Sequence, residues 1–372
     1  MESYGDIKAI RKRKRYLKRL YRQCQNQIER EKIGWSLIAN IELLHYHTHL
    51  ANFSIEGDIG RILNECVVLM RDIKYKKLNG ILRQEEPYMD TTYLSFLMKL
   101  ANNVADGNLQ RFESQIGGSF DRISAVNGAK HFYASLQDEA ISPVAEKILS
   151  DTSSIYFCEC RNEKDHLGST FFDYIFHKLY ICVLEHHDLR DLFTLIRECA
   201  LGVKFYMKED LHYDSFQNVC AYVMEELAFS YFETNGMNRE NIALFKKQRE
   251  SDFTAYANDT LMQIHALPGQ QGLRNFFHPN VNEILKVIPR QLKKDLIEIQ
   301  AYVMARGLVQ QIQLNKEIGL EHLKILMRMN ISNEQRPNFE KIGLGDDDLL
   351  TLTQEMSARS KNVYSGSNEK KR

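Results

Sequence analysis

Proline is scarce in this chain, and its distribution constrains the fold more than any other feature. The 372 residues include six prolines, and none lies between Met1 and Glu86. Because proline breaks helices, this spacing permits long helices and disfavours a turn-rich β architecture. One β-prone run, from Ser154 to Cys158, stands alone, so any sheet should be small. We therefore predict an all-α fold with a multi-helix globular core, a long basic N-terminal helix and a disordered C-terminal tail.

Helical periodicity and capping residues divide the chain into predicted helices. The first runs from Asp6 to about Gln27 and carries one apolar stripe, which consists of Ile10, Leu17, Tyr21, Cys24 and Ile28. Start and stop signals predict further helices at 59–78, after a cap at Asp90 or Thr91, from Ser142 and Pro143, within 169–234 with breaks near Leu189 and Asp214, at 238–265, from Asn282 with a break at Pro289, and at 316–329.

Composition divides the chain into four predicted regions. Residues 1–106 form a helical region with the basic first helix, and residues 107–168 form a hinge or linker region that contains several glycines. Residues 169–332 are the most apolar and form the predicted helical core. Residues 333–372 are rich in Ser, Asn and Lys, so we expect a mostly disordered tail that holds one short helix.

Charge and cysteine content restrict the possible environments. The 49 basic and 49 acidic side chains cancel, so no global field favours nucleic acid or an anionic membrane. The seven cysteines mostly lie among apolar neighbours, and the first residues contain no secretory signal. No apolar run approaches the roughly 20 residues that a membrane-spanning helix needs. These features predict a cytoplasmic protein with reduced thiols and no transmembrane segment.

The first helix carries a dense group of cations that could bind phosphate groups. If the protein contacts RNA, DNA or acidic lipid, we expect contact on this helix. The alternative is a solvated helix face balanced by acidic residues elsewhere. The predicted nucleic-acid-binding residues are Arg11, Lys12, Arg13, Lys14, Arg15, Lys18, Arg19 and Arg22.

A six-residue motif offers a catalytic alternative. The sequence Arg161-Asn162-x-x-x-His166 resembles the R-[N/H/D]-x-x-x-H signature of HEPN-domain ribonucleases. That resemblance implies an all-helical, dimeric ribonuclease that works without metal. His166 would then act as acid or base on the 2′-OH, Arg161 would hold the scissile phosphate, and Asn162 would orient the pair. A predicted helix over 169–182 suits this context, and the alternative is a surface loop.

Two metal-binding arrangements are incomplete. Cys158, Cys160 and His166 could offer two thiolates and an imidazole to zinc, but no second ligand pair lies at a suitable spacing. Two Glu-x-x-His motifs suggest a di-iron bundle, but neither has a well-placed upstream carboxylate. They are Glu42 with His45, followed by His49, and Glu163 with His166. We therefore predict no metal and no cofactor.

Three functions follow from these features, and the sequence leaves open whether the chain is an enzyme. The first is a non-enzymatic helical binding or scaffold protein, RNA-associated through its basic helix, with a protein partner or a second copy of itself. The alternative is a HEPN-like metal-independent ribonuclease that acts as a toxin or antiviral defence effector. The third is membrane attachment through the first helix, which a fully buried apolar stripe would argue against.

Overall fold

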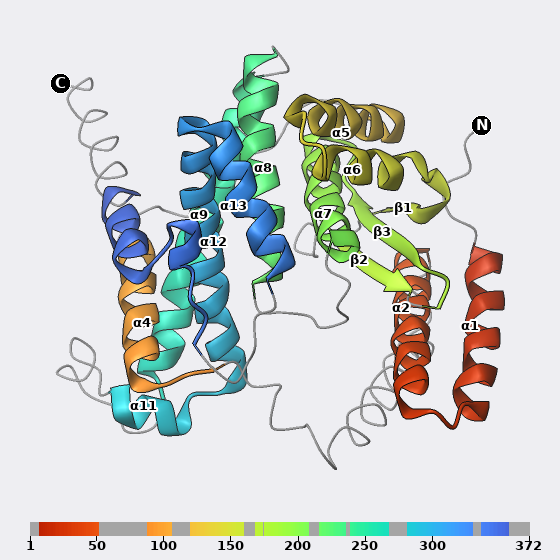
Figure 1. The fold of residues 1–372 in the computed structure, drawn as a ribbon, viewed down its shortest axis with the longest axis horizontal. Helices are drawn as coiled ribbons and strands as arrows, with labels where there is room; N and C mark the ends of the chain where they lie inside the picture. The colour runs from red at the N-terminus through yellow and green to blue at the C-terminus, as the bar shows by residue number, and fades with distance from the viewer. Residues whose placement is uncertain are drawn as a thin grey trace. The chain divides into compact units, whose positions relative to one another are not determined.

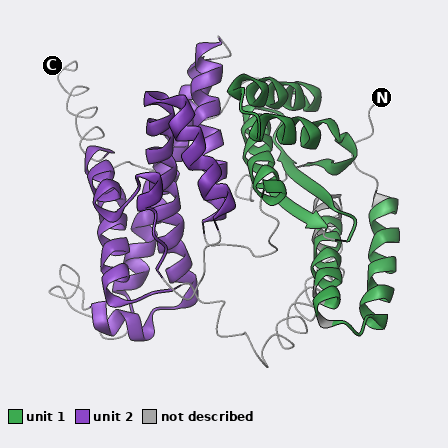
Figure 2. Cartoon of the chain, in the orientation of Figure 1, with its two compact units in different colours: residues 1–83, 117–209 green, residues 84–116, 210–372 purple. Residues whose placement is uncertain are grey.

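The chain forms two compact units, and each is assembled from separate stretches of sequence. The computed structural model describes residues 7–51, 88–105, 120–159, 168–173, 175–207, 216–235, 239–267, 281–329 and 336–356. Unit 1 combines residues 1–83 with 117–209, and unit 2 combines residues 84–116 with 210–372 (Figure 2). Helices dominate both units, which confirms the predicted fold class. The four predicted region boundaries stay predictions.

Unit 1 packs helices against a small sheet (Figure 1). The sheet has the order β1-β3-β2, in which β3 runs parallel to β1 and antiparallel to β2. The elements of unit 1 are α1 (Ile7–Gln23), α2 (Gln27–Ala51), α5 (Arg122–Leu136), α6 (Ile141–Ser150), η1 (Thr152–Ser154), β1 (Ile155–Glu159), β2 (Gly168–Asp173), β3 (Lys178–Glu185) and α7 (Leu189–Met207).

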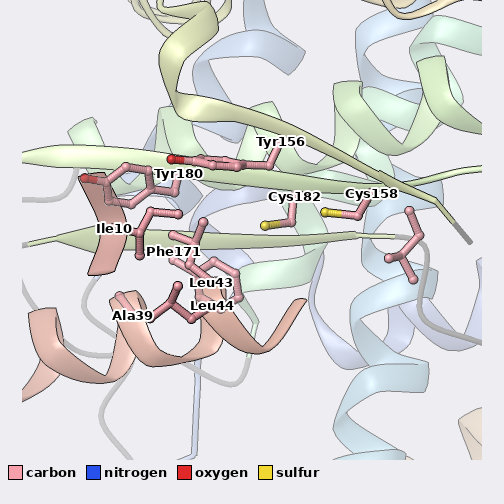
Figure 3. Close-up of a cluster of buried hydrophobic side chains, with 10 residues drawn as sticks. Ile10, Ala39, Leu43, Leu44, Tyr156, Cys158, Phe171, Tyr180 and Cys182 are labelled. Atoms are coloured by element: carbon pink, nitrogen blue, oxygen red, sulfur yellow. The ribbon is translucent and has the colours of Figure 1, made fainter. Parts of the chain in front are cut away.

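The central strand β3 is buried on both faces. Its residues Tyr180, Cys182 and Leu184 belong to an apolar cluster with Ile10 of α1 and with side chains of α2 (Figure 3). The alternate residue Leu179 points to the opposite face, where its side chain lies beside Gly202 of α7. A strand covered on both faces needs apolar residues at consecutive positions rather than at alternate ones.

That burial explains an error in the predicted secondary structure. The sequence predicts a helix over 169–182, whereas the chain forms β2 and β3 there. A continuous apolar run fits a buried helix or a doubly covered strand equally well. The predicted β-prone run is confirmed as β1, and the expected small sheet is confirmed with it.

Unit 2 is helical throughout its described residues. Asp90 accepts a hydrogen bond from the Tyr93 backbone N–H at 2.7 Å and so begins α4, as its position predicts. Pro289 separates α11 from α12, also as predicted. The elements are α4 (Thr91–Ala105), α8 (Gln217–Thr234), α9 (Arg239–His265), α11 (Val281–Val287), α12 (Arg290–Leu314), α13 (Lys316–Arg328), η2 (Glu340–Ile342) and a helix over 346–356.

The helix over 346–356 is the short helix expected in the C-terminal tail. Its residues Leu349 and Thr353 are buried, and Thr353 accepts a hydrogen bond from Asn103 of α4 at 3.0 Å. Leu344, just before it, lies against Gly307 of α12. This part of the tail is therefore packed onto unit 2, because its few apolar residues gather on one side.

The start of α6 differs from the predicted one. Ser142 followed by Pro143 predicts a start at that pair, but the helix begins at Ile141. The Asp138 carboxylate accepts hydrogen bonds from the backbone N–H groups of Ala140 (3.0 Å) and Ile141 (2.9 Å), and so satisfies donors at the helix start. Asp138, three residues before Ile141, therefore takes the capping role that the sequence predicts for Ser142.

Close helix packing in unit 2 leads to a first prediction. A Cβ atom added at Gly319 of α13 would lie 2.5 Å from the Ile312 backbone nitrogen of α12, and backbone cannot move aside cheaply. We expect Gly319→Ala to lower the free energy of unfolding by roughly 1–3 kcal/mol, despite alanine's higher helix propensity. In Gly202→Ala the clash at 2.3 Å is with the end of the Leu179 side chain, which can rotate, so the loss should be smaller. Urea unfolding of both variants measures which one loses more free energy of unfolding, and a larger loss for Gly202→Ala would contradict the prediction.

Candidate functional site

A cluster of charged side chains lies where β3 ends and α7 begins. Glu185 is the last residue of β3, and its side chain is only 2% exposed. Arg122 of α5 donates two hydrogen bonds to it, from Nε to Oε1 at 2.8 Å and from Nη2 to Oε2 at 2.6 Å. A bidentate pair of this kind fixes the orientation of the carboxylate. Glu185 is therefore a buried, immobilised carboxylate at the edge of the unit 1 core.

His187 brings an exposed imidazole to this carboxylate. Its Nδ1 lies 3.4 Å from Glu185 Oε1, whereas its side chain is 64% exposed. The His187 backbone has a φ of 59°, in the left-handed region that residues other than glycine rarely adopt. A solvent-facing histidine, backed by a fixed carboxylate and held in an unfavourable backbone conformation, is typical of functional sites.

Backbone hydrogen bonds hold the strained residue from two sides. Asp191 of α7 accepts hydrogen bonds from the N–H groups of His186 (2.8 Å) and His187 (2.9 Å). The His187 carbonyl accepts another from the Phe120 N–H at 2.8 Å. Both backbone groups of His187 are thus tied to separate parts of unit 1, so the surrounding fold maintains its conformation.

The neighbouring His186 turns its ring inward. Its side chain is 4% exposed, and Nδ1 lies 2.8 Å from the Leu184 carbonyl oxygen, so a proton on Nδ1 would donate to that oxygen. Its Nε2 has no hydrogen-bond partner among the described residues. In the tautomer that carries its proton on Nδ1, Nε2 is an unused acceptor.

Two thiols lie on the face of the sheet that packs against α2. Cys158 of β1 and Cys182 of β3 lie side by side, and both are buried (Figure 3). A hydrogen bond with Cys182 lowers the pKa of Cys158; burial opposes this shift, and the positive charge of Arg122 adds to it. All five cysteines whose positions are described are free thiols, as the sequence predicts.

A second cluster of charges is buried within unit 2. Glu225 and Glu226, adjacent on α8, pair with different arginines: Arg249 Nη2 of α9 lies 3.2 Å from Glu225 Oε2, and Arg306 Nη1 of α12 lies 2.9 Å from Glu226 Oε2. Arg306 also lies 3.2 Å from Glu250. Burial raises the pKa of Glu226, and the positive charge of Arg306 only partly offsets that effect. These pairs join α8 to α9 and to α12 through charges that are largely shielded from water.

The raised pKa of Glu226 predicts how stability depends on pH. Because the folded-state pKa exceeds the unfolded value of about 4.3, this side chain's contribution to stability is complete below that value. The contribution declines as pH rises through the higher folded-state pKa. We therefore expect the wild type to lose stability relative to Glu226→Gln as pH rises above about 4. Urea unfolding of both proteins at a series of rising pH values checks the prediction, and a constant difference would contradict it.

The predicted ribonuclease residues Arg161, Asn162 and His166 lie outside the described residues. The segments on either side of them are β1 and β2, whereas the HEPN resemblance implies helices there. The metal alternatives are no better supported, because no three described His, Cys, Asp or Glu side chains are arranged to hold a metal ion. Cys160, Glu163 and the side chains of Glu42, His45 and His49 also fall outside the described set.

The basic helix is confirmed as α1, and its cations fall into two groups. Arg11, Lys12, Arg15, Arg19 and Arg22 are exposed. The remaining three predicted residues are partly buried: Arg13, Lys14 and Lys18. The Arg13 guanidinium carbon lies 4.8 Å from the centre of the Tyr180 ring, so this cation packs on the sheet. Part of the basic run therefore has a structural role.

The apolar stripe of α1 is buried, which argues against membrane attachment through it. Ile10 and Leu17 are fully buried, and Tyr21 is 7% exposed. Ile28, which was predicted to continue the stripe, belongs to α2. Among the helices with described positions, none has the length and apolar character required to span a bilayer.

Sequence reasoning missed Arg122, Glu185, His187 and Asp191. A signal was present, because the charged run Glu185-His186-His187-Asp188 directly follows a continuous apolar run. Polar residues at the carboxyl end of a buried strand commonly carry function. The predicted helix over this apolar stretch hides that signal, because it leaves no strand end at Glu185.

The solved structures with a similar fold are peptidases. No protein-family model and no curated protein matches this sequence. The fold is similar to a protein described as an oligoendopeptidase F from Bacillus anthracis str. Ames, with a TM-score of 0.52 and 11% identity over 92% of this chain and 68% of that one. It is also similar to a peptidase from Chlamydophila abortus, with a TM-score of 0.51 and 12% identity over 92% of this chain and 63% of that one. A further oligoendopeptidase F structure gives a TM-score of 0.51 and 12% identity over 82% of this chain and 65% of that one.

These similarities correct the predicted functions. The chain shares a fold with peptidases and spans about two thirds of their length. The non-enzymatic, RNA-associated scaffold is wrong, and so is the alternative of a HEPN-like ribonuclease in antiviral defence. The basic helix and the short Arg-to-His motif misled the prediction, because both patterns recur by chance in chains rich in charged residues.

Proposed function

We propose that this protein is a peptidase-like protein that acts on peptides. The observation that supports this function is the similarity of fold to solved peptidases over 82–92% of the chain. Unrelated chemistries can share a fold, so the proposal also depends on the chemistry that the side chains offer.

The sequence restricts how such a protein could cleave a peptide bond. Zinc peptidases built on helices commonly use His-Glu-x-x-His, in which two histidines bind the metal and the glutamate acts as base. None of the 12 histidines in this chain is followed by glutamate. The residues present therefore do not fit zinc bound in that way, and we propose cleavage by other groups.

We also propose a cytoplasmic location, which suits the free thiols.

A peptide-cleavage assay tests this function. The full chain is incubated with a defined mixture of synthetic peptides, with and without EDTA, and new peptide ends are identified by mass spectrometry. We expect cleavage that EDTA does not abolish. Heat-unfolded protein controls for contaminating peptidases that survive heating, and a parallel incubation with RNA should leave the RNA intact. A chain that neither binds nor cleaves any peptide would overturn the proposal. A chain that binds peptides without cleaving them would contradict hydrolysis and leave peptide binding standing.

A further inference from the structure

We propose that His187 and Glu185 form the acid–base pair that carries out peptide hydrolysis. This inference rests on the proposed function and adds the groups that perform the chemistry. It is based on three features of the cluster at the end of β3: the contact between the two side chains, the immobilisation of Glu185 and the enforced backbone conformation of His187.

The contact gives the two ring nitrogens of His187 different roles. Nδ1 lies 3.4 Å from Glu185 Oε1, within ion-pair distance of the carboxylate. The other nitrogen, Nε2, is the one that can exchange a proton with water or substrate. A carboxylate at this distance from Nδ1 stabilises the imidazolium that forms when Nε2 takes up a proton.

Immobilisation of Glu185 keeps this arrangement ready for reaction. Arg122 binds both carboxylate oxygens, so Glu185 cannot rotate away from the imidazole. The Arg122 side chain is 42% exposed, so its positive charge reaches the surface in the same cluster. A fixed cation of this type stabilises the negative charge that develops on a carbonyl oxygen under attack.

The backbone of His187 indicates that its position is enforced. Asp191 and Phe120 hold its N–H and carbonyl, and the residue keeps a left-handed conformation that side chains other than glycine rarely adopt. His177 provides a natural comparison within unit 1. It is also an exposed histidine with a positive φ, of 46°, but it lies in the turn between β2 and β3.

The proposed reaction is the addition of water to a peptide bond. His187 Nε2 takes a proton from water as the water oxygen forms a bond to the carbonyl carbon, and the C=O π pair moves onto the oxygen. The intermediate then collapses, the C–N bond breaks, and the imidazolium returns its proton to the departing amine nitrogen. One water and one peptide give a carboxylic acid and an amine, with no oxidation or reduction.

Matched histidine variants test this inference. Asparagine tolerates the left-handed conformation, so His187→Asn and His177→Asn should both keep their backbones. With a peptide that the wild type cleaves, we expect His187→Asn to lower kcat by about 10²–10⁴-fold, which is the usual contribution of acid–base catalysis. His177→Asn should change kcat less than about 2-fold, since substitutions away from special sites have small effects.

Glu185 acts through His187, so it is a positioning residue and needs a separate test. We expect Glu185→Gln to lower kcat with little change in KM. A residue with a purely structural role would instead reduce the amount of folded protein and leave the kcat of the folded fraction unchanged. Thermal unfolding of every variant identifies any that fail to fold, and in that case His187→Gln replaces His187→Asn.

The outcomes separate this inference from the proposed function. If the wild type cleaves peptides and the folded His187 variant does so equally well, the acid–base pair is refuted while the proposed function stands. If the wild type binds peptides but cleaves none, the acid–base pair fails while peptide binding stands. If it neither binds nor cleaves peptides, both fail. A loss of activity in His187→Asn but not in His177→Asn, together with a lower kcat at an unchanged KM in Glu185→Gln, supports the pair.

Discussion

Replacing Arg249 with methionine is expected to lower the free energy of unfolding by about 3–5 kcal/mol. Arg249 and its partner Glu225 have side chains that are 16% and 5% exposed. Burial is the largest single effect and opposes the charge on Arg249, but the attraction of Glu225, its hydrogen bond and the nearby Tyr222 and Asp252 together outweigh burial and raise the pKa of the guanidinium. Without Arg249, the Glu225 carboxylate would stay buried with no compensating charge at this position. Its Oε1 already lacks a hydrogen-bond partner among the described residues.

An exposed ion pair in the same unit provides the control. Lys286 and Glu283 are in contact at 2.8 Å, but their side chains are 67% and 50% exposed. Lys286→Met should therefore change stability by less than about 1 kcal/mol. Urea unfolding compares the two variants, and equal losses would show that burial does not strengthen the Glu225–Arg249 pair. Adding Glu225→Leu to Arg249→Met should recover much of the loss, because the second change removes the unpaired carboxylate.

Phe253→Ala should have an effect of similar size. The Phe253 ring of α9 stacks on Tyr302 of α12, with ring centres 3.8 Å apart, and meets Tyr222 of α8 edge-on at 5.1 Å. Truncating a buried aromatic ring leaves a cavity and costs about 3–5 kcal/mol. Here the cavity would open where α8, α9 and α12 meet, so the loss should fall at the upper end of that range.

Two further variants make this prediction specific. Met262 lies on the same helix and is 64% exposed, so Met262→Ala should change stability by less than about 0.5 kcal/mol. Phe253→Leu should recover a large part of the loss, since leucine fills much of the cavity. The measurement is the urea midpoint and slope for each protein. If Phe253→Ala unfolds at the wild-type midpoint, the aromatic cluster does not stabilise unit 2.

Features with a local cause could be predicted from the sequence. Asp90 and Pro289 act on the backbone next to them, so both helix boundaries that they predict are observed. The strands β2 and β3 depend on cover from helices that are distant in sequence, and no local pattern indicates that cover. Glu185 and Arg122 are 63 residues apart, so their pairing depends on the whole of unit 1. The candidate site was missed for the same reason.

The division of each unit into separate stretches has a consequence for synthesis on the ribosome. The chain passes from unit 1 to unit 2, back to unit 1 and again to unit 2. Helix α4 is made early, yet its Tyr93 hydroxyl donates to Gln300, a residue 207 positions later. Residues 84–116 must therefore leave the ribosome long before their partners exist, with the apolar face of α4 exposed. A nascent chain halted just after residue 209 should expose α4 to protease or to a chaperone, whereas the released full-length chain should protect it.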